Sequence, residues 1–319
     1  MLDQIARYRI TPQMRHYDKV LYYWQPHVMY FNQINLRTKV CNTDERGFRW
    51  TYDKNDNRIS YDQFVAHPKP KGIILGNSTA FGVGATHDRY SITSYLNSIG
   101  DVTWFNFAGR GYNSTQELFL SQLYLETLKN LDYVVFVGGI SNLFGLFLAE
   151  EYDPAWGWFY GQYIFQRVFR DKEQGISDKL DVLGLNNSSN TINTKADYQK
   201  ALNIYRRDLS IWKALQNTYG FKIILALQPF AAWVDKELSQ EEKKLFSIYA
   251  KVPNYYLGHI LGDVKEGYVG GLREICEDLK IEFLDLPEVF TSSEWLFSDP
   301  GHLTDKGCLK TAEYLISKI

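Results

Sequence analysis

Six residues, spread over four short stretches of the chain, have the types needed for acyl transfer through a serine: Ser78, Gly111, Ser141, Asn142, Asp299 and His302. A serine hydroxyl attacks an acyl carbonyl when an imidazole takes its proton and a carboxylate orients that imidazole. Backbone amides and short polar side chains stabilise the charge that develops on the carbonyl oxygen. Each residue alone is weak evidence, because a serine after a strand usually serves as a turn or helix cap. The fold must therefore bring them together.

Five apolar runs predict the strands that would position these residues: 72–76, 102–107, 133–138, 222–227 and 281–286. Each run is apolar almost throughout, which is typical of strands buried on both faces of a parallel sheet. Helical patterns occupy the intervals: 89–98, 114–130, 196–218, 262–279 and 304–317. This alternation predicts an α/β protein, a three-layer α/β/α doubly wound sandwich with a five-stranded parallel sheet.

In such sheets, ligands bind beyond the carboxyl ends of the strands. The residues that follow the first three runs include Ser78, Gly111, Ser141 and Asn142. Asp299 and His302 lie between the fifth run and the last helical pattern, three residues apart around a Pro-Gly turn. We therefore expect all six residues at one edge of the sheet.

Taken in order, these stretches resemble the SGNH (GDSL-type) hydrolase superfamily. The family's first block, Gly-Asp-Ser with a Gly four residues after the Ser, is similar to Gly76-Asn77-Ser78 with Gly82. Its second block, an Asn and then a Gly before a polar turn, is similar to Asn106 followed by AGRGYNS. Its last block, Asp-x-x-His, is similar to Asp299-Pro-Gly-His302. The resemblance covers about residues 71–319, with Asn77 in place of the family's Asp.

The resemblance implies catalytic roles for Ser78 as nucleophile, His302 as base and Asp299 as its partner, with oxyanion donors from the amides of Ser78 and Gly111. It implies neither a metal nor a cofactor. The third block departs from the family, which has Gly-x-Asn-Asp where this chain has Gly139-Ile140-Ser141-Asn142. Either Ser141 supplies a shorter donor, or a bulge at the adjacent glycines turns Asn142 inward. The longer reach of the amide favours Asn142.

The function implied is a serine ester hydrolase that forms an acyl-serine intermediate, with a small-molecule or glycan acyl ester as substrate. Short acyl esters, such as O-acetylated sugars, fit the family. Two alternatives remain open: an O-acyltransferase with the same site, and a non-catalytic protein that keeps the fold and binds a glycan or a partner.

Two regions lie outside the alternation of strands and helices. Residues 1–70 form an N-terminal extension before the hydrolase-like domain of residues 71–319, and we expect a β-hairpin there about the turn Asn55-Asp56-Asn57. A long insertion, about residues 143–200, follows the third strand. It holds the aromatic residues Trp156, Trp158, Phe159, Tyr160, Tyr163, Phe165 and Phe169. Lid-like insertions and subsidiary hydrophobic clusters both fit this position.

Composition excludes several classes of partner. The chain of 319 residues has a formal net charge of −2 and no basic stripe, which argues against nucleic acid. No window approaches the run of about 18 apolar residues that a membrane span needs. Three widely separated cysteines argue against a disulfide framework or a zinc site. The N-terminus lacks the pattern of a signal peptide, so we expect a cytoplasmic location. The oligomeric state stays open.

Overall fold

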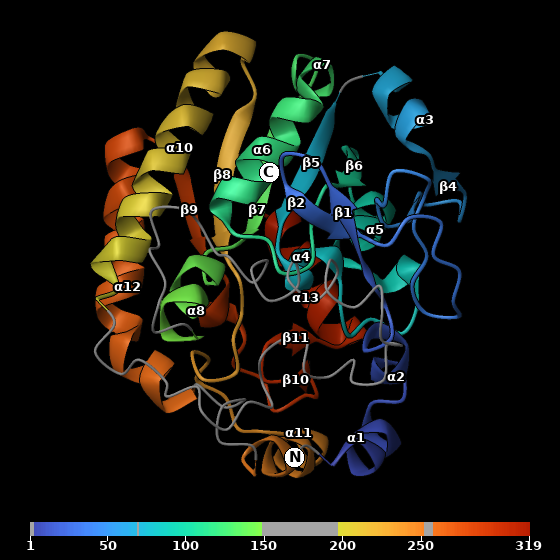
Figure 1. Cartoon of the computed structure of the whole chain (residues 1–319), viewed down its shortest axis with the longest axis vertical. Helices are drawn as coiled ribbons and strands as arrows, with labels where there is room; N and C mark the ends of the chain where they lie inside the picture. The colour runs from blue at the N-terminus through green and yellow to red at the C-terminus, as the bar shows by residue number, and fades with distance from the viewer. Residues whose placement is uncertain (1–2, 69, 149–196, 252–257) are drawn as a thin grey trace, which may run out of the picture.

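A five-stranded parallel sheet forms the centre of the computed structural model, which describes residues 3–68, 70–148, 197–251 and 258–319 (Figure 1). Its order is β6 (Thr103–Asn106), β5 (Lys71–Gly76), β7 (Tyr133–Gly138), β8 (Lys222–Leu227) and β9 (Glu282–Asp285). All neighbouring strands pair in parallel. The predicted fold class is confirmed, and each strand lies within one residue of its predicted run.

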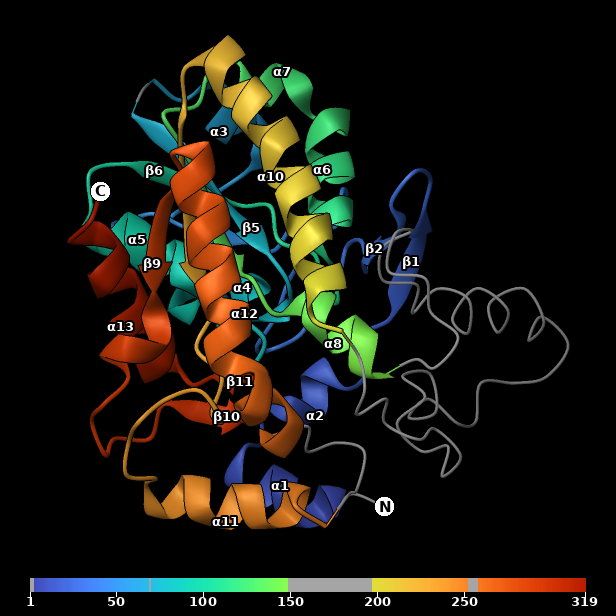
Figure 2. The same cartoon turned by 90° about the vertical axis from the view of Figure 1, so that its left-hand side faces the viewer.

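Helices cover both faces of this sheet, with α5 and α13 on one side and α6 and α10 on the other (Figure 2). The helices are α5 (Ile92–Ile99), α13 (Asp305–Ile316), α6 (Ser114–Leu123), α10 (Gln199–Tyr219) and α12 (Gly258–Leu279). Successive strand residues point to opposite faces of the sheet. Ile73 packs in the core that includes α6, α10 and α12, whereas Ile74 packs in the core that includes α5 and α13. Both cores therefore depend on the same buried strands.

The single helix expected over 114–130 is instead two, α6 and α7 (Leu125–Leu128), separated by Tyr124. A capping box starts α6, because the Asn113 side chain accepts from the amide of Gln116 at 2.9 Å. Tyr124 leaves helical geometry, and its ring packs edge-on against Phe48 and Phe107 at centroid distances of 5.2 and 5.5 Å. The interruption between α6 and α7 therefore coincides with the packing of the Tyr124 ring against the core.

The N-terminal region contains more structure than the sequence indicates. Its elements are α1 (Gln4–Ile10), α2 (Met14–Tyr17), β1 (Tyr22–Gln25), β2 (Met29–Asn32), β3 (Thr51–Tyr52), β4 (Arg58–Ile59) and α3 (Tyr61–Ala66). β3 and β4 make the expected hairpin, with Asp56 at φ 63° in its turn. The β1–β2 hairpin was not predicted, because its turn places His27 and Met29 at positive φ without a glycine or asparagine to signal it.

This N-terminal region shares the hydrophobic core of the sheet. Phe48 and Phe64 are fully buried beside strand β6, where Phe64 stacks on Phe105 at 5.1 Å and Phe48 lies 4.6 Å from Phe107. Burial of large aromatic rings is among the strongest contributions to stability. The region and the sheet are therefore expected to unfold together.

The remaining described elements surround the carboxyl edge of the sheet or lie below it in Figure 1: α4 (Ser78–Phe81), η1 (Asp88–Tyr90), α8 (Ser141–Leu148), α11 (Gln240–Tyr249), η4 (Leu286–Val289), β10 (Phe297–Asp299) and β11 (His302–Leu303). The aromatic residues of the insertion, Trp156 to Phe169, lie outside the described residues. Within the described ranges, no helix is both long and apolar enough to cross a membrane.

Phe48→Ala tests whether the N-terminal region and the sheet share one core. We expect the free energy of unfolding to fall by about 3–5 kcal/mol, because a fully buried ring is lost, in a single transition measured by chemical denaturation. Phe119→Ala is the matched control, since Phe119 is 45% exposed on α6; its effect should stay within about 0.5 kcal/mol. Equal effects of the two substitutions would contradict a shared core.

Candidate active site

Ser78 stands at the point where strand β5 turns sharply into helix α4. Gly76 makes this turn at φ 138°, and a Cβ there would lie 2.2 Å from the carbonyl oxygen of Val137. Asn77 caps the helix, because its side-chain oxygen accepts from the amide of Thr79 at 2.9 Å. Ser78 is thus the first residue of α4, at the carboxyl end of a central strand.

His302 and Asp299 reach this serine from a hairpin near the C-terminus. β10 and β11 pair so that Asp299 lies opposite His302. The Nε2 atom of His302 lies 2.8 Å from Ser78 Oγ, and its Nδ1 atom lies 2.7 Å from Asp299 Oδ2. The other oxygen of Asp299 accepts from the amides of Gly301 and His302 at 2.8 and 2.9 Å. The structure thus brings the three side chains together.

The environment of Asp299 keeps its carboxylate ionised. Burial alone would raise the pKa of Asp299, but three favourable influences outweigh it and lower the pKa below its usual value: the charge and hydrogen bond of His302, the charge of Arg7, and the amide of Gly301. An ionised carboxylate beside Nδ1 holds the hydrogen on that nitrogen. Nε2 is then free to accept the hydrogen of the serine hydroxyl.

Two backbone amides, those of Ser78 and Gly111, have no hydrogen-bond acceptor among the described residues. Gly111 lies in the loop after β6 at φ 73°, a left-handed conformation that favours glycine. The same loop is tied to the end of β5, since the Gly109 amide donates to the Gly76 carbonyl at 3.1 Å. Amides left unpaired in this way remain available to an anionic oxygen.

Ser141 and Asn142 face different partners. The chain leaves β7 through Gly139, at φ 97°, and enters α8 at Ser141. Ser141 Oγ accepts from the side-chain amide of Asn77 at 2.7 Å. Asn142 instead turns both polar atoms to Ser114 at the start of α6: its oxygen accepts from the Ser114 amide at 3.2 Å, and its nitrogen donates to Ser114 Oγ at 2.8 Å. Ser141, rather than Asn142, is therefore hydrogen-bonded to Asn77, the residue that precedes Ser78.

Gln228, at the end of β8, belongs to the same polar group and was missed in the sequence. Its side-chain oxygen accepts from Asn77 Nδ2 at 2.5 Å, and its nitrogen donates to Thr79 Oγ1 at 3.1 Å. Gln228 thus holds residues on both sides of Ser78. The signal was its position, because it directly follows the fourth apolar run at the same edge of the sheet.

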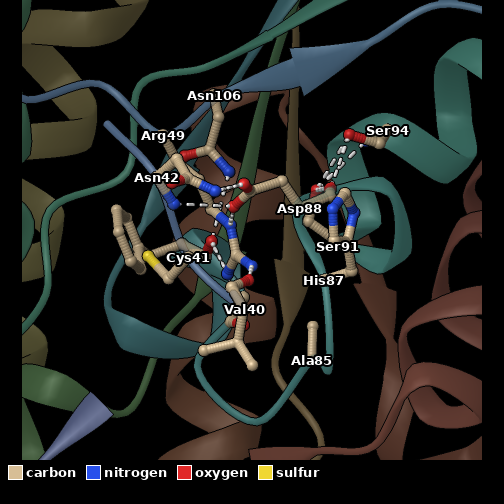
Figure 3. A network of polar contacts seen from close by, with 12 residues as sticks. Val40, Cys41, Asn42, Arg49, Ala85, His87, Asp88, Ser91, Ser94 and Asn106 are labelled. Atoms are coloured by element: carbon tan, nitrogen blue, oxygen red, sulfur yellow. Dashed lines mark hydrogen bonds and ion pairs between the residues drawn. The ribbon is translucent and has the colours of Figure 1, made fainter. Parts of the chain in front are cut away.

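A buried ion pair supports the end of helix α4, which begins at Ser78 (Figure 3). Arg49 and Asp88 have fully buried side chains and pair at 2.9 Å. Arg49 also donates to the carbonyl oxygens of Phe81 and Gly82 at 3.1 and 2.6 Å, where α4 ends. These contacts satisfy carbonyl groups that a helix end leaves unpaired.

A buried acid, Glu117, lies behind the third block. The pKa of Glu117 is raised well above its usual value, first by burial and then by the nearby charge of Asp208. On the same side, the hydroxyl of Tyr205 accepts from the Gly139 amide at 3.0 Å, and the hydroxyl of Tyr268 donates to the Gly139 carbonyl at 2.7 Å. Tyrosine hydroxyls on two helices therefore clamp the turn between β7 and α8.

No group of three or more His, Cys, Asp or Glu side chains in the described parts of the chain is arranged to hold a metal ion. The reactive groups that meet at the carboxyl edge of the sheet are a serine hydroxyl, an imidazole and a carboxylate, joined by direct contacts. Such a set can transfer an acyl group to the serine oxygen.

Comparison with known proteins gives structural likenesses only. No protein-family model and no curated protein matches the sequence. Similar solved structures include an extracellular lipase from Streptomyces rimosus, with 14% identity, a TM-score of 0.44 and coverage of 79% of this chain and 100% of the lipase. An acetyl xylan esterase has 12% identity, a TM-score of 0.44 and coverage of 78% and 99%. A putative lipolytic protein of the G-D-S-L family from Desulfitobacterium hafniense has 12% identity, a TM-score of 0.44 and coverage of 79% and 100%.

A lipase, an acetyl xylan esterase and a putative lipolytic protein of the G-D-S-L family are thus among the similar structures. With TM-scores below 0.5, these likenesses do not establish the chemistry of this chain. The distances within the site are the evidence for that chemistry.

Glu117→Gln tests the buried acid. Because the pKa of Glu117 is raised in the folded protein, its contribution to stability is present below the unfolded-state pKa and is lost as the pH rises toward the folded-state value. Glutamine does not titrate. The melting temperature of the variant minus that of the wild type should therefore be more positive at about pH 8 than at about pH 5. Glu274→Gln, at an exposed position, is the control. A difference independent of pH would contradict the raised pKa.

Proposed function

We propose that this protein is a serine ester hydrolase of the SGNH type, with Ser78, His302 and Asp299 as its catalytic residues. The observation that carries the proposal is the continuous contact from Ser78 Oγ to His302 Nε2 at 2.8 Å and from His302 Nδ1 to Asp299 Oδ2 at 2.7 Å. Distances of this length allow direct transfer of the serine proton to the imidazole. The order of the sequence blocks supports the same roles.

In the proposed reaction, His302 takes the hydroxyl proton of Ser78 as its oxygen attacks the ester carbonyl. Asp299 stabilises the imidazolium that results. The tetrahedral intermediate collapses when His302 returns the proton to the leaving alcohol, which leaves an acyl group on Ser78. Water then gives a proton to His302 and attacks the acyl-serine, and His302 passes that proton to Ser78 Oγ as the bond to the acyl group breaks and the acid is released. The amides of Ser78 and Gly111 hold the oxyanion in both steps.

The third oxyanion donor in this proposal is Ser141 rather than Asn142. The Ser141 oxygen already accepts from Asn77, which leaves its own proton to donate. Asn142 is held by two hydrogen bonds to Ser114. Asn77 fits the same arrangement, because its amide nitrogen donates to both Ser141 and Gln228, which an ionised aspartate could not do.

The proposed substrates are short acyl esters, and O-acetylated sugars are the class that the resemblance to the family favours. A series of acetyl, butyryl and longer esters, assayed with the purified protein, would rank the acyl lengths. Repeating the assay with a sugar hydroxyl acceptor would reveal O-acyl transfer. Absence of turnover on every ester would favour a binding protein that keeps the fold.

Ser78→Ala tests the nucleophile. The variant should lose ester hydrolysis by several orders of magnitude, because the three side chains act as a unit, and it should no longer react with a fluorophosphonate probe. Intact-mass measurement after labelling gives the stoichiometry, and thermal melting checks the fold. Ser98→Ala is the matched control, since Ser98 is exposed on α5. Undiminished hydrolysis by folded Ser78→Ala would disprove the mechanism.

Ser141→Ala and Asn142→Ala test the third donor. Loss of a true oxyanion donor lowers kcat by about 10²–10³. We expect a loss of this size for Ser141→Ala and a smaller one for Asn142→Ala, measured as kcat per site titrated with the fluorophosphonate. The reverse ranking would assign the donor to Asn142, whose amide has the longer reach.

A further inference from the structure

We propose that Tyr30, on strand β2 of the N-terminal β1–β2 hairpin, is the positioning residue that sets the orientation of the Gly111 amide. This inference rests on the proposed function, in which that amide is an oxyanion donor. It assigns a role to the region before the sheet, for which the sequence offered none. The contacts between β2 and the loop of residues 108–111 support it.

Two side chains of β2 reach this loop. Tyr30 and Asn32 are two residues apart on the strand, so their side chains point to the same face. Both are buried, at 4% and 1% exposure. Asn32 donates to the carbonyl of Ala108 at 3.1 Å and accepts from the amide of Arg110 at 3.1 Å. It thereby fixes the loop on the N-terminal side of Gly111.

Tyr30 fixes the other side of the glycine, because its hydroxyl donates to the Gly111 carbonyl at 2.8 Å. The peptide that carries the Gly111 N–H lies between these two anchored groups, the Arg110 amide and the Gly111 carbonyl. Glycine at φ 73° has wide conformational freedom, so the peptide could rotate if one anchor were removed. The Tyr30 hydroxyl is therefore the group that limits where the Gly111 amide points.

The Arg110 side chain strengthens the same connection. Its guanidinium donates to the carbonyl oxygens of Val20 and Leu21 at 3.0 and 3.2 Å, directly before β1. It also lies over the ring of Tyr22 at 4.3 Å. The loop is thus bonded to the hairpin through backbone groups and through a buried cation, and the two should move as one body.

Removal of the Tyr30 hydroxyl should leave this packing in place. The ring lies edge-on to Tyr22 and Tyr112, at centroid distances of 5.1 and 5.8 Å, and these contacts need no hydroxyl. The Tyr112 hydroxyl donates to the backbone carbonyl of Tyr30, which a substitution of the side chain retains. Tyr30→Phe therefore removes the hydrogen bond to Gly111 and keeps these ring contacts.

The experiment compares Tyr30→Phe with Tyr23→Phe, which removes a hydroxyl from a residue of β1 that is 39% exposed. Turnover of a short ester is measured per active site titrated with a fluorophosphonate, so misfolded protein does not count. For Tyr30→Phe we expect kcat to fall about tenfold, below the 10²–10³ that loss of a whole donor costs, with KM little changed. Tyr23→Phe should match the wild type.

A second readout separates positioning from general stability. An alkyl boronic acid forms a reversible tetrahedral adduct with the serine oxygen, and one boron-bound oxygen then occupies the oxyanion position. Its affinity should fall by the same factor as kcat in Tyr30→Phe, because both depend on the Gly111 amide. A residue that only stabilises the fold would lower the melting temperature without changing kcat or boronate affinity per titrated site.

The outcomes distinguish the two proposals. If the wild-type protein neither turns over esters nor reacts with the fluorophosphonate, the proposed function is wrong and this inference falls with it. If the wild type is active but Tyr30→Phe keeps kcat and boronate affinity per titrated site, only the role of Tyr30 is overturned. A parallel loss of both quantities, absent from Tyr23→Phe, supports it.

Discussion

The buried ion pair between Arg49 and Asp88 joins three parts of the chain around the helix that carries Ser78. Charges are costly to bury, so a buried pair needs hydrogen-bonding partners for its remaining donors and acceptors. Asp88 accepts from the backbone and side-chain amides of Asn42 at 3.1 and 2.7 Å, and Arg49 donates to Val40 and to the end of α4. Loss of one partner from such a pair typically costs about 3–5 kcal/mol. Loss of Arg49 would also leave the carbonyl groups of Phe81 and Gly82, at the end of α4, without this donor.

The N-terminal region therefore contributes to the site as well as to the core. Besides Arg49, Tyr17 donates to the carbonyls of Gly82 and Ala85 at 3.1 and 2.8 Å, and Gln13 donates to Gly84 at 2.9 Å. Tyr30 holds the Gly111 loop in the same manner. Side chains that precede the first strand of the sheet thus bond to the segment that follows α4 and to the loop that holds Gly111.

The chain's regular elements follow from local patterns. Continuous apolar runs mark the buried strands, and Asn113 and Thr304, which cap α6 and α13, are residue types that commonly cap helices. The β1–β2 hairpin was not recognisable, because its positive-φ turn residues are not those that usually adopt such angles. The helix break at Tyr124 could not be predicted from the local sequence either. It accompanies ring contacts with Phe48 and Phe107, which lie outside the helix in the sequence.

By itself the sequence determined the strands of the sheet, because continuous apolar runs are local patterns. It also pointed to the edge where the polar residues gather, and the resemblance to the SGNH family made Ser78, Asp299 and His302 the candidates there. Only the tertiary structure decided which of Ser141 and Asn142 bonds to Asn77, the residue before Ser78, because a helix that begins at Ser141 turns adjacent side chains in different directions. It alone showed Gln228 between Asn77 and Thr79 and the N-terminal side chains around Gly111. Those contacts join residues far apart in the chain, and no spacing in the sequence encodes which distant hydroxyl or amide will meet a given carbonyl.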